Sequence, residues 1–389
     1  MLITATAVAV LAQTDSCSSQ TSAASEADLV SMAGCSTFSG TLTISGPSIT
    51  SITLNWASLT GTLKVASNRH LEVLSLEGLK SSTGTITLFN NTILSSVKMP
   101  NVTSLNVLEI ITAPNLRKLS LPQIESVGTL KAEDTGFDNS GPVPWTDLRK
   151  AGHLGLSNNK ALKSIEIPHL GSVSSHLVVS ANGLMEGGGE GSALLASNLS
   201  TCSNCTFRHL TELDLSNLVS VGSALALAET NLKSVKMAKL KSVGQTLSIA
   251  SNNQLANVTF PELGTIGGAL QVANNSILTQ IDGFPKLTEI GGVLDIRGAI
   301  TNATWPAIKS VQGGLTVMSS THFDCTTLAN VKAGTRGKVQ CQEMSKSAQP
   351  SSNRNGNSSD ADSSAGSTSM HRGSALAALI LLSGLALMF

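Results

Sequence analysis

The stretch LKSVGQTLSIASNNQLANVTFPELGTIGGALQVANN, residues 240–275, contains the pattern that decides the fold. Apolar residues alternate with small or polar ones at 247–249 and again at 258–260. Because a period of two puts alternate side chains on opposite faces of a strand, each repeat is predicted to contain two short, half-buried strands. A glycine-containing bend, at 243–244 and at 266–268, precedes the first strand, and we expect glycine there because tight corners can require positive φ.

This pattern recurs along most of the chain. The first apolar position of each repeat returns every 21 to 24 residues, except for one step of 48 residues. The positions are Leu42, Leu63, Ile86, Leu108, Leu130, Leu154, Leu177, Leu225, Leu247, Leu270, Leu294 and Leu315. Self-similarity at this period is typical of a solenoid, and no repeat has a convincing helical period of ten residues. The sequence therefore predicts an all-β fold, a right-handed parallel β-solenoid of about a dozen turns over residues 13–344.

Asparagine recurs five residues after the first apolar position in half of these repeats. The residues are Asn68, Asn91, Asn159, Asn182, Asn252 and Asn275. If they stack at one corner of the solenoid, their amides can satisfy backbone groups of the turns. We therefore interpret them as a structural ladder, with ligand binding as the minor alternative.

The step of 48 residues is predicted to hold an insertion within one turn, residues 183–208. The segment is rich in glycine and contains two sequons and the sequence Cys202-Ser-Asn-Cys205. A flexible loop is the simpler interpretation, and a binding surface is the alternative, because insertions in solenoids often emerge at binding faces. Residues 187–189 are all glycine, but they lack the lysine and the strand–helix setting of a phosphate-binding loop, so no nucleotide site is expected.

Composition excludes several classes of partner. The chain has 389 residues with 25 basic and 25 acidic side chains, whereas nucleic-acid-binding domains carry a basic surplus or patch. Hydrophobic residues make up 41% of the chain, which is ample for a core and excludes wholesale disorder. Aromatic residues make up only 3%, which weakens the case for polysaccharide binding by ring stacking but leaves recognition by hydrogen bonds open.

Both ends of the chain are predicted to be targeting segments. Residues 1–12 form a short apolar run that we interpret as a secretory signal, although no basic residue precedes it. Residues 345–364 are rich in serine and are predicted to form a disordered, O-glycosylated stalk. With residues 365–389, the chain shows small residues, then a polar spacer and then an apolar tail, which is the signal for GPI attachment. We therefore expect the protein to contact the membrane only through the GPI lipid. The first choice of attachment residue is Ser364, and the alternatives are Ala365, Gly366 and Asn357.

The six cysteines form three local pairs, which fits disulfides in an exported protein. Cys17 with Cys35 and Cys325 with Cys341 are the expected bridges, one near each end of the repeats. The third pair, Cys202 and Cys205, is expected to close a small disulfide loop. Redox chemistry or a zinc site is the weaker alternative, because no second CxxC exists and His209 is the only other ligand nearby.

Eight Asn-x-Ser/Thr sequons are predicted to carry N-glycans on accessible loops. Their asparagines are Asn90, Asn101, Asn198, Asn204, Asn257, Asn274, Asn302 and Asn357. The sequon at Asn204 is the doubtful one, because its middle residue is Cys205.

A β-helical polysaccharide enzyme would need two or three carboxylates in register on neighbouring turns. Glu166 and Asp214 are expected on successive turns of the second strand, but Lys236 follows them instead of a third acid. A group of acids at 133, 134 and 138 is interpreted as a solvated corner. Six of the seven histidines lie in or next to the repeats and show neither a common register nor a metal-ligand spacing: His70, His153, His169, His176, His209 and His322. We therefore expect no catalytic residue, no metal and no cofactor.

The turn LANVTFPELGTIGGALQVANN, residues 255–275, resembles the repeat of receptor L-domains. Together with CSTFSGTLTIS at 35–45, HFDCTTL at 322–328, the serine-rich stalk and the GPI-like tail, the chain resembles the fungal GPI-anchored cell-wall organisation proteins, a family related to sporulation-specific cell-wall proteins. The resemblance covers nearly all of the chain.

This resemblance implies a non-catalytic surface glycoprotein that supports cell-wall organisation and integrity. Its location would be the outer leaflet of the plasma membrane, the cell wall or both, and its partners would be wall polysaccharide or wall glycoproteins. The family supplies no catalytic residue to transfer. A surface adhesin or receptor-like ligand binder is the alternative function, and a wall-polysaccharide-remodelling enzyme that uses Glu166 or Asp214 is a third.

Overall fold

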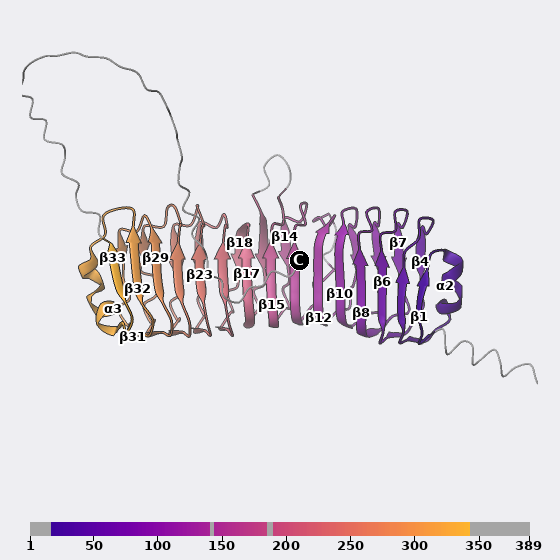
Figure 1. Ribbon diagram of the computed structural model, residues 1–389, viewed down its shortest axis with the longest axis horizontal. Coiled ribbons are helices and arrows are strands. Elements are labelled where there is room, and N and C mark those ends of the chain that lie inside the picture. Colours follow the sequence, from indigo (N-terminus) through magenta and orange to yellow (C-terminus); the bar gives the residue numbers. More distant parts are fainter. Residues whose placement is uncertain (1–16, 141–143, 185–189, 343–389) are drawn as a thin grey trace, which may run out of the picture. The chain divides into compact units, whose positions relative to one another are not determined.

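The computed structural model describes residues 17–140, 144–184 and 190–342. They belong to one compact unit, Met1–Ser345, and the predicted signal, stalk and GPI segments lie outside them. Figure 1 shows this unit as a row of short strands stacked side by side, from β1 to β33. The helical segments are α2 (Glu26–Ala33), η1 (Cys325–Leu328) and α3 (Ala329–Gly334). None of these helices, within the part of the chain described, is long and apolar enough to cross a membrane.

The main sheet of the solenoid has 22 strands, and every pairing in it is parallel. Its ladder strands are β1 (Gln20–Ala23), β3 (Thr41–Ile44), β6 (Thr62–Ala66), β8 (Ser81–Phe89), β10 (Ser104–Ala113), β12 (Ser126–Thr135), β13 (Lys150–Ser157), β15 (Ser172–Ser180), β17 (Thr201–Arg208), β20 (Leu225–Ala228), β23 (Leu247–Ala250), β26 (Leu270–Ala273), β29 (Leu294–Gly298), β32 (Leu315–Ser319) and β33 (Val339–Gln342). Two-residue strands widen the sheet: β2 (Thr37–Phe38), β5 (Ser58–Leu59), β19 (Ser220–Val221), β22 (Ser242–Val243), β25 (Thr265–Ile266), β28 (Glu289–Ile290) and β31 (Ser310–Val311).

The repeat positions predicted from the sequence, from Leu42 to Leu315, form one buried row of the main sheet. The same row includes residues of turns that the sequence pattern did not identify, namely Thr21, Cys205 and Val339. These turns lack leucine and isoleucine at the row position and therefore escaped the pattern. The parallel β-solenoid is confirmed, with about 14 turns in place of about a dozen. Its right-handed sense stays a prediction.

Glycine in the bends before the ladder strands is required by close packing between turns. A Cβ atom added to Gly267 would lie 2.1 Å from the carbonyl oxygen of Gly244, and one added to Gly244 would lie 2.0 Å from the carbonyl oxygen of Gly222. Backbone atoms cannot yield to contacts this short, so only glycine fits. The expectation of positive φ at these bends is wrong. Among the glycines that the structure describes, those with positive φ are Gly183, Gly191 and Gly298.

Left-handed backbone occurs instead at the corner that follows the ladder strands. Ten corner residues other than glycine have φ between 52° and 57°: Ser67, Asn90, Thr112, Asp134, Asn158, Ala181, His209, Glu229, Ser251 and Asn274. For a residue with a Cβ atom this conformation costs roughly 1–2 kcal/mol, so it persists only where neighbouring contacts fix it.

In most turns an asparagine or threonine after the corner supplies those contacts, and the predicted asparagine ladder is confirmed. The amide oxygen of Asn252 accepts from the N–H of Thr230 at 2.9 Å and from its hydroxyl at 2.7 Å. The amide nitrogen of Asn252 donates to the carbonyl oxygen of Leu227 and to Oδ1 of Asn275, both at 3.0 Å. All six predicted asparagines are buried. They lie in three runs, which are separated by Ala113 and Leu210: Asn68–Asn91, Thr135–Asn159–Asn182 and Thr230–Asn252–Asn275.

The second face of the solenoid is formed by the short strands that follow each corner, and it is interrupted. Its four sheets are β4 (Ser51–Thr53), β7 (Val73–Ser75), β9 (Ser96–Lys98) and β11 (Lys118–Ser120); β14 (Ser164–Glu166), β16 (Ser192–Leu195) and β18 (Leu210–Asp214); β21 (Ser234–Lys236) and β24 (Asn257–Thr259); and β27 (Gln280–Ile281) and β30 (Asn302–Ala303). Between β11 and β14 lies a turn whose described residues contain no strand on this face.

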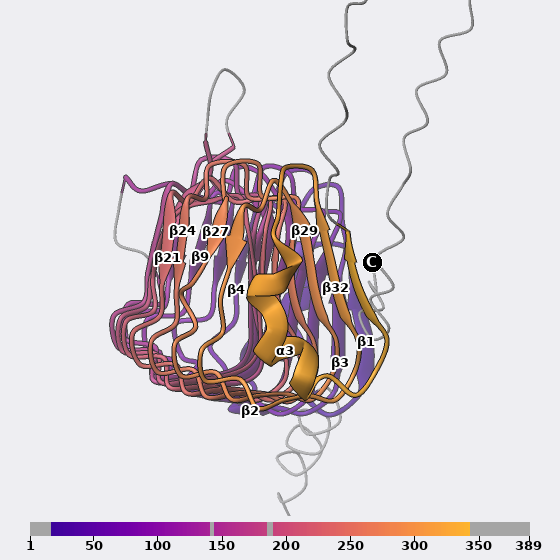
Figure 2. The same cartoon turned by 90° about the vertical axis from the view of Figure 1, so that its left-hand side faces the viewer.

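Helical caps cover both ends of the core. Helix α2 buries Leu29 and Met32, and Nε1 of Trp56 donates to the carbonyl oxygen of Met32 at 2.8 Å. At the other end, η1 and α3 bury Leu328 and Val331, and Figure 2 shows α3 lying across the end of the stack. Caps of this kind keep water from the last apolar layer of a repeat protein.

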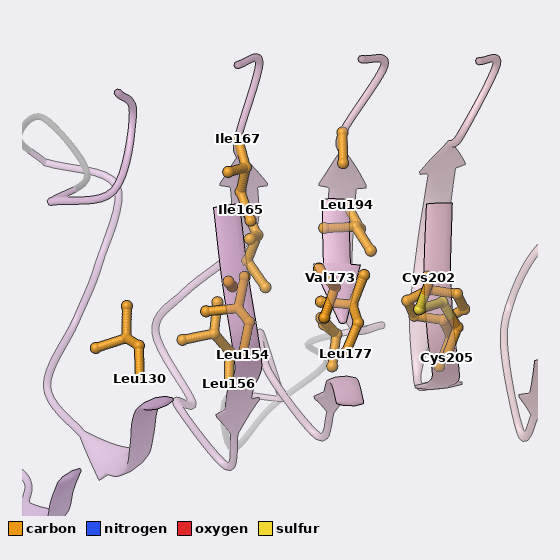
Figure 3. Packing of buried hydrophobic residues seen from close by; sticks show 14 of the residues in the cluster. Leu130, Leu154, Leu156, Ile165, Ile167, Val173, Leu177, Leu194, Cys202 and Cys205 are labelled. Carbon is orange, nitrogen blue, oxygen red and sulfur yellow. A yellow bond between two sulfur atoms is a disulfide. The ribbon is translucent and has the colours of Figure 1, made fainter. Parts of the chain in front are cut away.

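The prediction of an insertion at residues 183–208 is wrong, because most of this segment forms a turn of its own. Strand β16 lies between β14 and β18 on the second face, and β17 lies between β15 and β20 in the main sheet. Cys202 and Cys205 occupy the two buried rows in which the preceding turn has Val173 and Leu177. Figure 3 shows their sulfur atoms among the core side chains. The apolar pattern missed this turn because cysteines hold its core positions.

Candidate functional site

The break in the second face originates in residues 136–148. In the preceding turn, four residues separate the core positions Leu116 and Leu121, whereas seven residues separate Phe137 from Trp145. The segment also includes Pro144, which has no N–H to donate to a strand ladder. The described residues of this segment form no strand, so the second face is interrupted between β11 and β14, and a cleft lies at the interruption.

We call this opening the sheet-break cleft. It has a volume of about 470 Å³ and lies along β11. Its floor consists of Phe137 and Trp145, which are both buried and whose rings meet edge to face, with centroids 5.7 Å apart. Its polar groups are Arg117, Lys118, Ser120, Asp138 and Ser140. The cleft thus combines an apolar floor with several hydrogen-bonding side chains, as small-ligand sites do.

Asp138 is the negative centre of the cleft. The hydroxyl of Ser140 donates to its Oδ1 at 2.5 Å, and the N–H of Ser140 donates to the same atom at 2.9 Å. These bonds, together with the positive charge of Arg117, lower the pKa of Asp138 below its ordinary range. Nη1 of Arg117 lies 3.9 Å from Oδ2 of Asp138, and its side chain is 71% exposed. An ionised acceptor therefore stands beside a guanidinium donor that a ligand can reach.

Asn139 covers the other side of the break. Its Oδ1 accepts from the N–H groups of Lys163 and Ser164 at 2.8 and 3.0 Å, and its Nδ2 donates to the carbonyl oxygen of Ser164 at 2.8 Å. One side-chain amide thereby satisfies the edge of β14 in place of a neighbouring strand. This explains how the fold tolerates the gap.

Sequence reasoning missed the cleft, although a signal was present. On the second face, Ser75, Lys98 and Ser120 follow one another at steps of 23 and 22 residues and pair in the structure, whereas the next such position, Glu166, comes 46 residues after Ser120. A jump of two repeat lengths indicates a turn without a second strand. Asp138 was interpreted as part of a solvated corner, but it lines the cleft.

Glu166 and Asp214 do not lie on successive turns, and that expectation is wrong. Glu166 pairs with Leu195 on β16, and Leu195 pairs with Asp214 on β18. Each carboxylate also accepts a hydrogen bond from its own segment, from the hydroxyl of Ser164 at 3.2 Å and from the N–H of Ser216 at 3.0 Å. The two acids therefore stand apart on a sheet face with an apolar residue between them.

Two histidines do share a register, contrary to expectation. His153 on β13 pairs with His176 on β15, and their ring centroids lie 5.5 Å apart on the outer face of the main sheet. Burial lowers the pKa of His153, and the charges of His176 and Lys131 lower it further. Within the described part of the chain, no group of three or more His, Cys, Asp or Glu side chains could hold a metal ion.

The predicted glycosylation sites are distributed over several surfaces. Asn90 and Asn274 are corner residues after ladder strands, and Asn204 lies on the main sheet. The others are on the second face or in the turns that follow its strands: Asn101, Asn198, Asn257 and Asn302. Five of these seven asparagines are exposed, whereas Asn204 and Asn302 are half-buried. Glycan addition stays a prediction.

Three disulfides join the cysteines in the pairs Cys17–Cys35, Cys202–Cys205 and Cys325–Cys341. The first and third attach the two ends of the described chain to the caps. The second closes the small disulfide loop predicted from the sequence, and both of its cysteines are buried in the core of the main sheet. The GPI candidates Ser364, Ala365, Gly366 and Asn357 lie outside the described residues.

Comparison with known proteins gives relatives along most of the chain. The cell surface GPI-anchored protein of Arthroderma benhamiae is 27% identical over 88% of this chain and 87% of its own length. Sporulation-specific protein 2 of Saccharomyces cerevisiae is 26% identical over 74% of this chain and 61% of its own length. The cell wall mannoprotein PST1 of the same yeast is 30% identical over 80% of this chain and 69% of its own length.

The chain belongs to this family of fungal GPI-anchored cell-surface and cell-wall proteins. Membership places it at the cell surface or in the cell wall, which it reaches through the secretory pathway. None of the three relatives is named as an enzyme. No family model and no solved structure matches the chain, so the resemblance of its turns to receptor L-domains stays a prediction.

Proposed function

We propose that this chain is a non-catalytic, GPI-anchored glycoprotein that supports fungal cell-wall organisation, and that its sheet-break cleft binds a neutral wall polysaccharide. The signal is residues 1–12, and the GPI group is attached at Ser364 or at one of its alternatives, Ala365, Gly366 and Asn357. Residues 345–364 act as the stalk. Membership in the family carries the first part of the proposal, and the polar groups of the cleft carry the second.

The solenoid suits a scaffold. One hydrophobic cluster extends through all the turns, from Ala23 to Val331, and both of its ends are capped and bridged by disulfides. Successive turns are also tied by the buried asparagine runs. A continuous core of this kind resists bending, because every turn packs on two neighbours. Such a body can hold a stable spacing between the membrane and the wall.

The cleft suits hydroxyl-rich ligands. Sugar hydroxyls donate and accept hydrogen bonds, and the cleft offers a donor at Arg117, an acceptor at Asp138 and hydroxyls at Ser120 and Ser140. Because the aromatic rings of the floor are buried, recognition proceeds through hydrogen bonds and not through stacking on an open ring face. Lys118 adds a positive charge, so an acidic polysaccharide is the competing ligand to be tested.

The surface address is tested by release of the protein from intact cells. A phosphatidylinositol-specific phospholipase C is used in one arm and a β-glucanase in the other. We expect release by one of them, and the effective enzyme distinguishes membrane from wall residence. If neither enzyme releases the protein and it is found inside the cell without glycans, the proposed address and function are both wrong.

Ligand binding is tested with the full-length glycoprotein by co-sedimentation with purified β-glucan, chitin, neutral mannan and phosphorylated mannan. Arg117→Ala and Asp138→Asn are expected to weaken binding of one neutral polymer about tenfold, the equivalent of one or two lost hydrogen bonds. The matched control is Arg297→Ala, which removes the arginine of another exposed ion pair, 2.8 Å from Asp295 on the main sheet.

Three outcomes would contradict the cleft assignment. Equal loss in the Arg297→Ala control would indicate a nonspecific charge effect. Selective binding of phosphorylated mannan would indicate an acidic ligand. Release of sugar by the purified protein, abolished by Glu166→Gln or Asp214→Asn, would show an enzyme in place of a binder.

A further inference from the structure

The two ends of the solenoid carry opposite charge. Residues 17–63 contain two acidic residues, Glu26 and Asp28, and no lysine or arginine. At the other end, residues 324–342 contain three basic residues, Lys332, Arg336 and Lys338, and one acidic residue, Asp324. The described residues of the two ends therefore differ in the sign of their charge, which is negative around α2 and positive in the turn that ends with β33.

Both ends of the main sheet are also open edges. In the described residues, β1 pairs only with β3, and β33 pairs only with β32. Because alternate residues of a parallel strand point their backbone groups to opposite sides, Gln20 and Ser22 direct their N–H and C=O groups away from β3. Val339 and Cys341 direct theirs away from β32 in the same manner. A strand edge of this kind is a template for another strand.

The negative end has a groove that can receive such a strand. The groove has a volume of about 300 Å³ and lies between β1 and α2, with Ser19 and Thr21 on one side and Asp28 and Ser31 on the other. Hydrogen bonds from Ala24 and Ser25 lower the pKa of Asp28, which keeps its carboxylate charged in mildly acidic surroundings. The groove therefore offers backbone groups and a negative charge together.

The positive end presents the complementary parts. Every residue from Arg336 to Gln340 is exposed, so the charges of Arg336 and Lys338 stand beside the β33 edge. Each end also exposes a valine, Val30 at 74% on α2 and Val339 at 41% on β33. Moreover, no sequon occurs before Asn90 or between Asn302 and residue 342, so both ends are free of predicted N-glycans.

We propose that copies of this chain associate head to tail, with β33 of one copy adding in parallel to the β1 edge of the next, beside Asp28. The contact joins different surfaces of the two copies and does not close on itself, so it generates open chains. This inference goes beyond the proposed function and is independent of polysaccharide binding in the sheet-break cleft.

The test uses the purified full-length glycoprotein in analytical ultracentrifugation and negative-stain electron microscopy. At low salt and up to about 100 μM, a range that covers weak, small interfaces, we expect end-to-end chains of solenoids. Raising the ionic strength should shorten them, because exposed charges are screened. Wild-type protein that stays monomeric throughout, or that associates side by side, would overturn the proposal.

Charge reversal makes the test specific. Asp28→Lys and Lys338→Glu should each weaken self-association about tenfold or more, because like charges then face each other. A mixture of the two variants should recover association, because each then meets an opposite charge at both contacts. The controls Glu125→Lys and Lys233→Glu make the same charge changes on exposed residues away from the ends and should associate like the wild type.

The mixing arm also controls for folding. Since Asp28 caps α2, Asp28→Lys could loosen that helix, and circular dichroism of each variant checks for this. If both variants are folded and their mixture fails to associate, the proposed contact is wrong. If the control reversals weaken association equally, the charges at the ends have no special role.

Discussion

The main sheet and the second face are built from the same turns, yet one is continuous and the other is broken. Every turn contributes a strand to the main sheet, whereas the second face falls into four small sheets. The difference lies in what fixes each strand. Glycine bends with no room for a Cβ atom precede the main-sheet strands, and the corner with its buried asparagine runs follows them. The second face has no comparable device at its break, where Asn139 on the surface substitutes for a strand.

The comparison shows where a solenoid can vary. A turn can lose its second strand provided that its core positions remain filled, as Phe137 and Trp145 fill them. A main-sheet strand cannot be lost as easily, because the strands on both sides depend on its backbone groups. The cleft accordingly lies on the face that tolerates interruption.

The largest expected difference in stability is between asparagine-to-alanine substitutions on the two faces. Asn252→Ala removes four hydrogen bonds from a buried corner and leaves the N–H of Thr230 without its acceptor, so we expect a loss of about 3 kcal/mol. Asn139→Ala removes three bonds at an exposed position, where water replaces them, and should cost less than about 1 kcal/mol. Hydrogen exchange of the flanking strands and the urea midpoint measure both.

Asn253→Ala serves as the control, because Asn253 is the exposed neighbour of Asn252. Equal losses for Asn252→Ala and Asn139→Ala would mean that the asparagine runs do not account for the difference between the faces.

An intermediate effect is expected from the disulfides. Cys202→Val with Cys205→Leu installs the residue types found in the same rows of the next turn, Val221 and Leu225, so the lost cross-link is largely offset and the net change stays within about 1 kcal/mol. Removing the terminal bridge by Cys17→Ala with Cys35→Ala should cost about 2 kcal/mol, because it closes a longer loop and nothing replaces it. Chemical unfolding of the oxidised proteins compares the two. A larger loss for the central pair would show that this bridge is needed to form its turn.

The smallest expected effect is the dependence of stability on pH. Because the folded-state pKa of His153 is lowered, protonation favours the unfolded chain, so stability falls as the pH drops from the ordinary histidine value of about 6.5 towards the lowered one. Solvent screening of the half-exposed ring keeps this loss below about 1 kcal/mol. His153→Thr, which copies Thr129 in the same row, should flatten the dependence of the thermal midpoint on pH.

The control for this effect is His169→Thr, an exposed position outside the main sheet, which should follow the wild type. If His153→Thr keeps the full slope of the wild type, the pair on the main sheet does not contribute to acid sensitivity.

The sequence by itself determined the solenoid, its period, the row from Leu42 to Leu315 and the asparagine ladder. These features repeat every turn, and a repeat is visible in one chain because each turn meets the same packing conditions. The family likewise followed from the repeat together with the two ends of the chain.

Only the tertiary structure decided the features that occur once. The turn containing Cys202 and Cys205, the gap between β11 and β14, and the pairing of His153 with His176 all depend on which turns lie side by side. The role of the bend glycines was also hidden, since the carbonyl that excludes a Cβ atom at Gly267 belongs to the preceding turn. A local sequence pattern shows the packing needs of a single turn, whereas a site is formed by contacts between neighbouring turns.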